Sequence, residues 1–334
     1  MRRTGLIRRA ISICLIALMT LITMQAEAIS CWRVYAYDNY NENSSDDLVS
    51  VYVISSQYVK NNKSKKKYLD RKFSYYDNGL LKSIQDSGLF TEFGFPFDTY
   101  YSYHDNSKLA GALVIDGFGT YVGGICICNY DKTGNLTGFN WLYDEGLENT
   151  AFCIESKYSY NGGKISRDRA WTYYSENDDG ILDADLDELL DVGIDDMEHF
   201  YSYAKEWLES GTMKERHKVW DMKLSYNKAG LVKKEMGKML GKKITITRKY
   251  DKKNNCSSMR SNRSDFNYKK VTNKYNKNGL LTKTTFKQGN YTDTYYYKYK
   301  KIEVPKEVAA EVYAQRWALQ NNNTNYKLVF YEEY

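Results

Sequence analysis

A short phrase built on tyrosine, glycine and an aliphatic residue returns along the chain and limits its possible folds more than any other feature. Glycine follows the tyrosine by four residues, and leucine or valine follows it by six. Clean copies begin at Tyr75, Tyr130, Tyr226 and Tyr275, and degenerate copies begin at Tyr103, Tyr160 and Tyr250. The steps between copies are 28, 27, 30, 66, 24 and 25 residues, so one step contains an insertion.

The residue types in this phrase are those of a β-hairpin turn. Asp or Asn after the tyrosine can bond its side chain to the backbone two residues on, and glycine suits a type I turn or the left-handed residue that follows one. Alternating polar and apolar residues lead in and out, as in "KFSYY" and "LTKTTF". A single hairpin is barely stable, but a regular series can pack its tyrosines and leucines side by side in one sheet. The composition agrees, with 33 tyrosines and only 2 prolines.

We therefore expect a mainly β protein, an antiparallel meander of hairpins that forms one curved sheet. Hairpin repeats are predicted at 29–175 and 217–304, with an acidic helical insertion at 176–216. Leucines and aromatic residues at helical spacing support the insertion. A C-terminal helix from Pro305 to about Gln320, with Val308, Val312 and Leu319 buried and Trp317 nearby, and a closing strand are predicted within 305–334. The helices should cover one face or an edge of the sheet.

Units of the form Y-D-x-x-G-x-L at this spacing resemble the YD repeats of RHS-type bacterial secreted proteins. The phrase "YYDNGLLKS" is also similar to the short repeats of the MORN-like YwqK family. The resemblance covers roughly residues 70 to 165 and 220 to 300. RHS-type proteins build large hollow shells that enclose a toxin, whereas this chain has far fewer repeats and no evident autoprotease or toxin segment. The resemblance thus implies a β-sheet scaffold, and a small RHS-like effector or immunity protein is one alternative that follows from it.

The first 28 residues have the form of a secretory signal. A basic start, "MRRTGLIRR", precedes an apolar stretch that ends at an A-x-A site, "AEA". Its removal takes away four arginines and one glutamate, so the net charge falls from +6 to +3. Two alternatives are an uncleaved anchor and lipid attachment at Cys31. No other apolar run is long enough to cross a bilayer, so we expect a secreted or periplasmic bacterial protein that is not an integral membrane protein.

Four further cysteines allow a disulfide in an oxidising compartment. Cys126 and Cys128 would face the same side of a strand, so a bond between them is awkward. Cys153 on the next strand is the candidate partner. The alternatives are buried thiols or a metal pair, and no second pair at metal-ligand spacing supports the latter.

The insertion holds the densest set of acids. Eleven carboxylates and no basic residue lie between Glu176 and Glu198. The spacing does not fit a calcium loop, but Asp178, Asp179, Asp183 and Asp185 could form a looser oxygen cage for calcium. The simpler interpretation is that these acids complement a helix dipole and form a solvated face, in which case no cofactor is needed.

The opposite charge dominates residues 214–302, with 25 Lys and Arg against 6 acids. A basic face attracts any polyanion, and export favours an envelope glycan, another polyanion or a protein over nucleic acid. The other interpretation is that these lysines line the wet face of a sheet and guard its edges. Exposed tyrosines could also bind sugars, and the candidates are Tyr75, Tyr130, Tyr226, Tyr275 and Tyr297. For the repeated tyrosine the sequence favours packing in the sheet.

The sequence offers no positioned catalytic set. Its three histidines stand alone, and no HExxH, GxSxG or P-loop motif is present. We therefore expect a non-catalytic binding or structural module, and name no catalytic residue. The alternative from another class is a secreted glycan hydrolase that uses carboxylates of the insertion. Such an enzyme would need two carboxylates about 5 to 9.5 Å apart.

Overall fold

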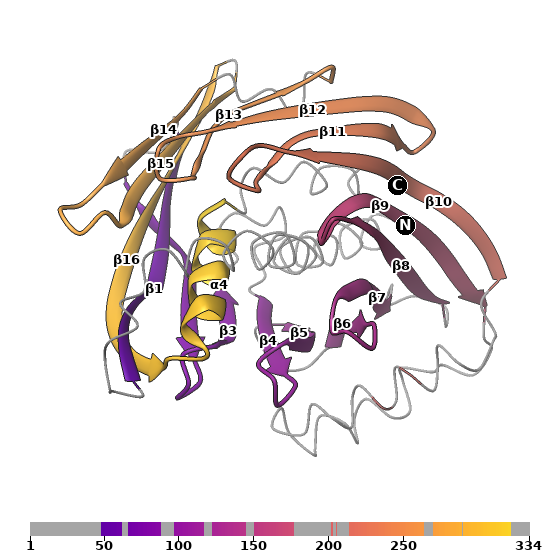
Figure 1. Ribbon diagram of the computed structural model, residues 1–334, viewed down its shortest axis with the longest axis horizontal. Coiled ribbons are helices and arrows are strands. Elements are labelled where there is room, and N and C mark those ends of the chain that lie inside the picture. Colours follow the sequence, from indigo (N-terminus) through magenta and orange to yellow (C-terminus); the bar gives the residue numbers. More distant parts are fainter. Residues whose placement is uncertain are drawn as a thin grey trace.

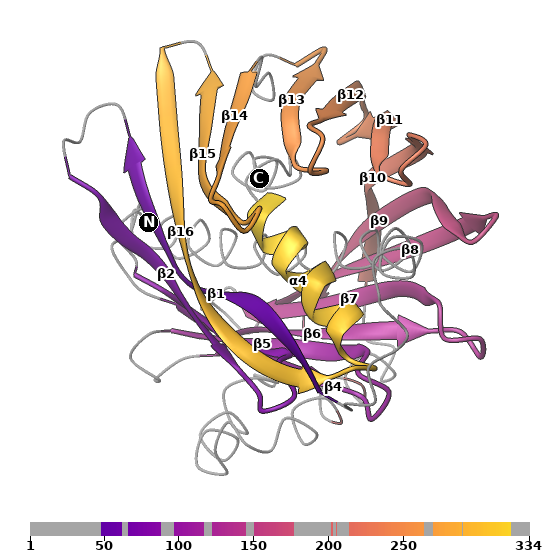
Figure 2. The same ribbon diagram turned by 60° about the vertical axis from the view of Figure 1, so that its left-hand side comes forward.

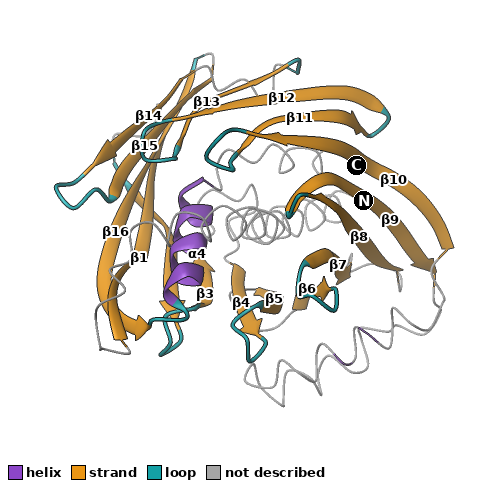
Figure 3. Ribbon diagram, viewed as in Figure 1, coloured by secondary structure: helices purple, strands orange, loops and turns teal. Residues whose placement is uncertain are grey.

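One antiparallel sheet of 16 strands accounts for most of the fold (Figures 1 and 3). The computed structural model describes residues 48–61, 66–87, 97–116, 122–144, 150–176, 214–263, 270–288 and 290–321, together with Ser202 and Lys205. The strands are β1 (Leu48–Asn61), β2 (Tyr68–Tyr75), β3 (Leu81–Asp86), β4 (Phe97–Tyr103), β5 (Leu109–Asp116), β6 (Val122–Tyr130), β7 (Leu136–Asp144), β8 (Thr150–Asn161), β9 (Lys164–Glu176), β10 (Lys214–Tyr226), β11 (Val232–Met239), β12 (Lys242–Tyr250), β13 (Cys256–Ser261), β14 (Lys270–Tyr275), β15 (Leu281–Gln288) and β16 (Tyr291–Pro305).

The strands follow one another as a meander that curls until its ends meet. Strands β1 to β13 lie in chain order, and β14 to β16 continue from the other side of β1 because β16 pairs with β1. This pairing runs from Leu48 opposite Pro305 to Asn61 opposite Asp293. In the described sheet the two edges are β13 and β14, which we call the seam. Figures 1 and 2 show the nearly closed curve. The predicted antiparallel meander in one curved sheet is confirmed.

Each repeat of the phrase forms the same hairpin turn, with one shorter variant. In the first copy the Gly79 N–H donates to Tyr76 O and the Tyr76 N–H donates to Leu80 O. Gly79 has φ of 84°, the left-handed conformation that the position requires. A β-bulge then shifts the register, so that Tyr75 pairs with Leu81. The predicted side-chain bond also forms, since Asp131 Oδ1 accepts the Thr133 N–H at 2.9 Å. The copy at Tyr160 instead turns on two glycines.

The insertion leaves the sheet between two neighbouring strands. β9 ends at Glu176, β10 begins at Lys214, and the two strands pair with each other antiparallel. The repeat at Tyr226 therefore follows the repeat at Tyr160 in the sheet as if nothing separated them. Of the helices predicted for the insertion, the structure describes only Ser202 and Lys205, and both are helical. The signal at 1–28 and the closing strand after the last helix lie outside the described residues.

Helix α4 (Ala309–Asn321) lies inside the curve of the sheet (Figures 1 and 2). Its Ala318 and Leu319 join the main core, which lines the concave face and includes the fully buried Trp141 and Trp220. The predicted buried residues Val308, Val312, Trp317 and Leu319 are at most 6% exposed. The predicted start of the helix at Pro305 is wrong. Pro305 ends β16 and pairs with Leu48, where a residue without an N–H is tolerated at a strand end.

Polar side chains of α4 hold backbone groups on two separate parts of the sheet. Gln315 Oε1 accepts the Leu81 N–H at 2.9 Å, and Asn321 Oδ1 accepts the Cys256 N–H at 2.9 Å. The Trp317 indole N–H donates to Asn254 O, also at 2.9 Å. Leu81 begins β3, and Cys256 begins β13 at the seam. The helix therefore ties the start of the meander to its far edge.

Candidate functional site

The repeated tyrosines join neighbouring hairpins through their hydroxyl groups. Each hydroxyl donates to the carbonyl of an aliphatic residue on the preceding strand of the sheet; in every pair except that of Tyr75 and Ile54, this residue closes the preceding hairpin. The donor and acceptor pairs are Tyr75 to Ile54 (2.7 Å), Tyr103 to Leu81 (2.8 Å), Tyr130 to Leu109 (2.8 Å), Tyr160 to Leu136 (2.7 Å), Tyr226 to Ile165 (2.6 Å), Tyr250 to Val232 (2.7 Å) and Tyr299 to Leu281 (2.5 Å). We call this series the tyrosine ladder.

The ladder forms where the backbone pairing between hairpins stops. Between β3 and β4 the pairing ends at Ser83 opposite Tyr100, so the Leu81 carbonyl lies beyond it. The Tyr103 hydroxyl takes up this carbonyl, as a buried carbonyl requires a partner. Burial raises the pKa of Tyr160 and of Tyr299 to about 12. At neutral pH these hydroxyls are therefore protonated donors.

The predicted sugar-binding tyrosines belong to this internal scaffold. Tyr75, Tyr130 and Tyr226 pack against the main core and donate in the ladder. Tyr275 donates to Asp251 Oδ2 at 2.5 Å instead, and Tyr297 is 4% exposed and donates to Gln320 O. Their packing role is thus visible in the structure, and contact with a ligand stays a prediction.

The predicted calcium ligands Asp178, Asp179, Asp183 and Asp185 lie outside the described residues. Within the part of the chain that the structure describes, no three His, Cys, Asp or Glu side chains come together in a way that could hold a metal ion.

Cys126, Cys128 and Cys153 are buried free thiols. Cys126 and Cys128 lie on β6, and Cys153 lies on β8. The expected bond from Cys153 to the β6 pair does not form, because β7 lies between the two strands and Cys153 pairs with Leu142. Burial raises the pKa of the Cys126 thiol, and the adjacent Cys128 raises it further.

The outer face of β8, β9 and β10 carries a cluster of cations around one indole ring. Trp171 points outward, because its strand neighbours Ala170 and Thr172 are buried on the inner side. Arg216 stacks over the ring with its guanidinium carbon 4.2 Å from the ring centroid. Three more cations surround it, at 5.5 Å for Lys218, 5.7 Å for Arg169 and 5.9 Å for Lys157. Together with Glu155, Arg167, Tyr173 and Asp221, these residues form what we call the Trp171 patch.

Glu155 anchors one side of the patch. Its carboxylate accepts hydrogen bonds from Lys157 (2.5 Å), Arg216 (2.9 Å) and the Tyr173 hydroxyl. Burial acts to raise the pKa of Glu155, but the bonds from Lys157 and Tyr173 outweigh it and hold the pKa below its usual value. The carboxylate therefore stays charged at neutral pH and fixes Arg216 against Trp171.

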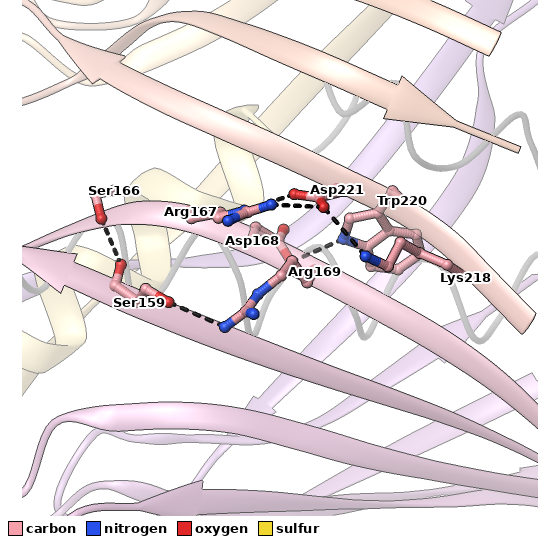
Figure 4. A network of polar contacts seen from close by, with 8 residues as sticks. All are labelled: Ser159, Ser166, Arg167, Asp168, Arg169, Lys218, Trp220 and Asp221. Atoms are coloured by element: carbon pink, nitrogen blue, oxygen red, sulfur yellow. Dashed lines mark hydrogen bonds and ion pairs between the residues drawn. The ribbon is translucent and has the colours of Figure 1, made fainter. Parts of the chain in front are cut away.

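Asp221 anchors the other side (Figure 4). Arg167 donates to its two oxygens at 2.7 and 2.8 Å, and Lys218 donates at 3.3 Å. The bond from Arg167 lowers the pKa of Asp221. On the inner side of the same strands, the Trp220 indole N–H donates to the buried Asp168 at 2.7 Å. The strands that carry the outer cations are thus joined to each other on their inner face by the hydrogen bond between Trp220 and Asp168.

The patch keeps a positive surplus that faces solvent. Its five cations oppose two carboxylates, a net of +3. The side chains of Lys157, Arg167, Arg216 and Lys218 are between 42% and 51% exposed, whereas both carboxylates are 18% exposed. A ligand therefore meets cations and an aromatic edge before it meets an acid.

Sequence reasoning missed this patch. The signal in the sequence is an alternation of charge and aromatic residues, "SRDRAW" at 166–171, and a second basic run, "KERHK" at 214–218. Only the pairing of β9 with β10 brings the two runs together, with Lys218 opposite Trp171. The predicted wet face of lysines is visible along β16, where Lys298 and Lys300 are exposed and Tyr299 between them packs against the inner core.

Known proteins offer only distant likenesses to this chain. No protein-family model and no curated protein matches it. A porin-like protein from Bacteroides uniformis is 10% identical, with a TM-score of 0.40, and the match covers 74% of this chain and 98% of that one. A Tc holotoxin pore from Photorhabdus luminescens is 12% identical, with a TM-score of 0.25, and the match covers 73% of this chain and 14% of that one. A TcdB2-TccC3 structure is 11% identical, with a TM-score of 0.25, over 78% and 14%.

At these identities and TM-scores the likenesses carry no argument about function. Among the described residues, no helix is long and apolar enough to cross a bilayer.

Proposed function

We propose that this protein is a non-catalytic binding module that holds an acidic polysaccharide against the Trp171 patch. The observation that carries the proposal is the set of four cations around one outward-facing indole ring. Three of them, Lys157, Arg216 and Lys218, are held by the carboxylates of Glu155 and Asp221. Preset cations lose little freedom on binding, which favours affinity for a charged ligand.

A polyanion fits the charge of the surface better than a neutral ligand does. The cations of the patch are half exposed, and each can exchange its water for an anionic oxygen. Arginine is suited to carboxylate and sulfate groups because its planar fork forms two parallel hydrogen bonds. Trp171 and Tyr173 add flat apolar edges of the kind that pack on sugar rings. An acidic sugar chain offers both kinds of group.

The place of action is part of the proposal. The signal-like start of the chain supports export, so the ligand would be met in the cell envelope or outside the cell. We also propose that the chain is a short relative of the secreted YD-repeat proteins. The support is that the repeated phrase forms one type of hairpin and a shared tyrosine ladder.

Binding to alginate, heparin and neutral dextran tests the proposal, with released reducing sugar assayed in the same samples. We expect the acidic chains to bind, and their binding to weaken as salt is raised, because exposed charges are screened. The double variant Arg216→Ala/Lys218→Ala should lose roughly tenfold in affinity, equivalent to ~1.4 kcal/mol.

The matched control is Lys233→Ala/Lys238→Ala, which removes the same charge from exposed positions on β11. If the control loses as much affinity as the patch variant, net charge explains binding and the patch is not the site. Release of sugar would overturn the non-catalytic part, and equal binding of dextran would overturn the polyanion part.

A further inference from the structure

A second group of cations and aromatic rings lies on the outer face of β1, β15 and β16. The Tyr296 ring has the Lys67 ammonium 3.6 Å from its centroid and the Lys283 ammonium 5.4 Å away. Next to it, Lys298 lies 4.7 Å from the centroid of the Tyr58 ring and donates to its hydroxyl at 3.1 Å. Tyr58 and Tyr296 pair directly across β1 and β16. We call these five residues the Tyr296 patch.

This patch faces outward and is cationic. On β16 the side chains of Tyr295, Tyr297 and Tyr299 pack on the inner core, so Tyr296 and Lys298 point the other way. Lys67 and Lys298 are exposed and Lys283 is half-buried. Among the described residues, none of these three lysines forms an ion pair with a carboxylate. Asp70 on the neighbouring strand is 8% exposed and accepts a bond from Gln57 instead.

The two patches lie on opposite walls of the curved sheet. Eight strands, β1 to β8, separate β16 from β9 in one direction, and six strands, β15 to β10, separate them in the other. Figure 1 shows β1 and β16 on one side of the molecule and β8 to β10 on the other. A stiff polysaccharide chain bound at one patch therefore lies on the opposite wall from the other patch.

From this placement we infer that the protein is bivalent, with each patch holding its own acidic polysaccharide chain, so that one molecule bridges two chains. The inference rests on the proposed function, since both patches would take the same class of ligand. The charge surplus of both patches and their placement on opposite walls of one sheet carry it. A molecule that bridges in this way joins two polysaccharide chains without any direct contact between those chains.

Turbidity of long alginate or heparin chains, whichever binds in the first screen, tests the inference. The wild-type protein should cross-link the chains and cloud the solution at intermediate ratios, and the clouding should clear when polysaccharide is in excess. Short oligosaccharides of the same sugar should bind with a stoichiometry of two. Sedimentation of the free protein checks that it is monomeric, because a dimer with one site per copy would also cross-link.

Variants separate this inference from the proposed function. Lys283→Ala/Lys298→Ala should abolish clouding, halve the stoichiometry and leave binding at the Trp171 patch unchanged. Arg216→Ala/Lys218→Ala should also abolish clouding and halve the stoichiometry, while binding at the Tyr296 patch stays unchanged. Lys233→Ala/Lys238→Ala should cloud the solution as the wild-type protein does. Full clouding by Lys283→Ala/Lys298→Ala, or a wild-type stoichiometry of one, would overturn bivalence while the proposed function stands. Absence of binding by the wild type would overturn both.

Discussion

At the scale of single residues, the repeated tyrosine performs two physical tasks at once. Its ring packs against the inner core. Its hydroxyl donates a hydrogen bond to a backbone carbonyl that lies beyond the last paired residues of the two strands. The second task arises because the pairing between neighbouring hairpins stops early: β5 and β6 pair only as far as Gly111 opposite Ile127, so the Leu109 carbonyl lies beyond the last pair. This explains why the chain keeps tyrosine and not phenylalanine at these positions.

Tyr130→Phe should isolate the value of one ladder bond. The change keeps the ring and leaves the Leu109 carbonyl without its donor. We expect the free energy of unfolding to fall by about 0.5–1.5 kcal/mol, measured by urea denaturation. Tyr296→Phe is the control, because the Tyr296 hydroxyl makes no hydrogen bond to the described part of the chain. Equal midpoints for the two variants would show that the ladder adds nothing to stability.

At the scale of elements, helix α4 acts as a cross-brace inside the sheet. Its buried amides Gln315 and Asn321 are 1% and 3% exposed. Each accepts a hydrogen bond from a backbone N–H at the start of a strand, where strand pairing gives that N–H no partner. A leucine at either position would bury more apolar surface but would leave those groups unpaired, which costs more than a hydrogen bond returns. The helix is therefore specific for this sheet and could not be exchanged for any apolar helix.

Asn321→Ala tests the brace at the seam. It leaves the Cys256 N–H and the Asn255 side chain without their partner on α4. We expect a loss of about 1–3 kcal/mol in the free energy of unfolding and faster hydrogen exchange at the Cys256 amide. Asn278→Ala serves as the control, because its exposed side chain makes one hydrogen bond, at 3.5 Å to the Tyr52 hydroxyl; it should change stability by less than about 0.5 kcal/mol. A Cys256 amide that keeps its protection in Asn321→Ala would contradict the brace.

At the scale of the whole molecule, the ring of described hairpins is interrupted at the seam. Strands β16 and β1 complete the ring as if they were another hairpin, since Tyr299 lies opposite Ile54 just as Tyr75 lies opposite Leu81. At the seam no described backbone pairing joins β13 to β14. The side-chain amide of Asn273 donates to the Cys256 carbonyl at 3.0 Å. The ladder breaks at the same place, because Tyr275 bonds to Asp251. The seam is therefore the weakest part of the ring.

Hydrogen exchange across the sheet should show this order of stability. Amides of β13 and β14 that face the seam should exchange about tenfold faster or more than amides in the middle of β7, which is paired on both sides. Amides of β16 and β1 should resemble those of β7, because their long pairing closes the ring. Equal protection in β14 and β7 would mean that the seam is closed in solution.

The local structure of this protein followed from its sequence, and the arrangement of its surfaces did not. Turn chemistry is local: a tyrosine, an acid or amide and a glycine at fixed offsets specify a hairpin, because each needs only its neighbours within six residues. The curved sheet followed from the regular spacing of such hairpins, and the burial of Val312 and Leu319 followed from helical spacing.

Only the tertiary structure decided how the sheet closes, where α4 lies and which cations meet. The pairing of β16 with β1 joins residues about 250 positions apart, and the Trp171 patch joins strands across an insertion. The residues around Trp171 and Arg216 in the sequence do not predict which strand pairs with the strand of each. That choice belongs to register and closure, which depend on the packing of the whole ring at once.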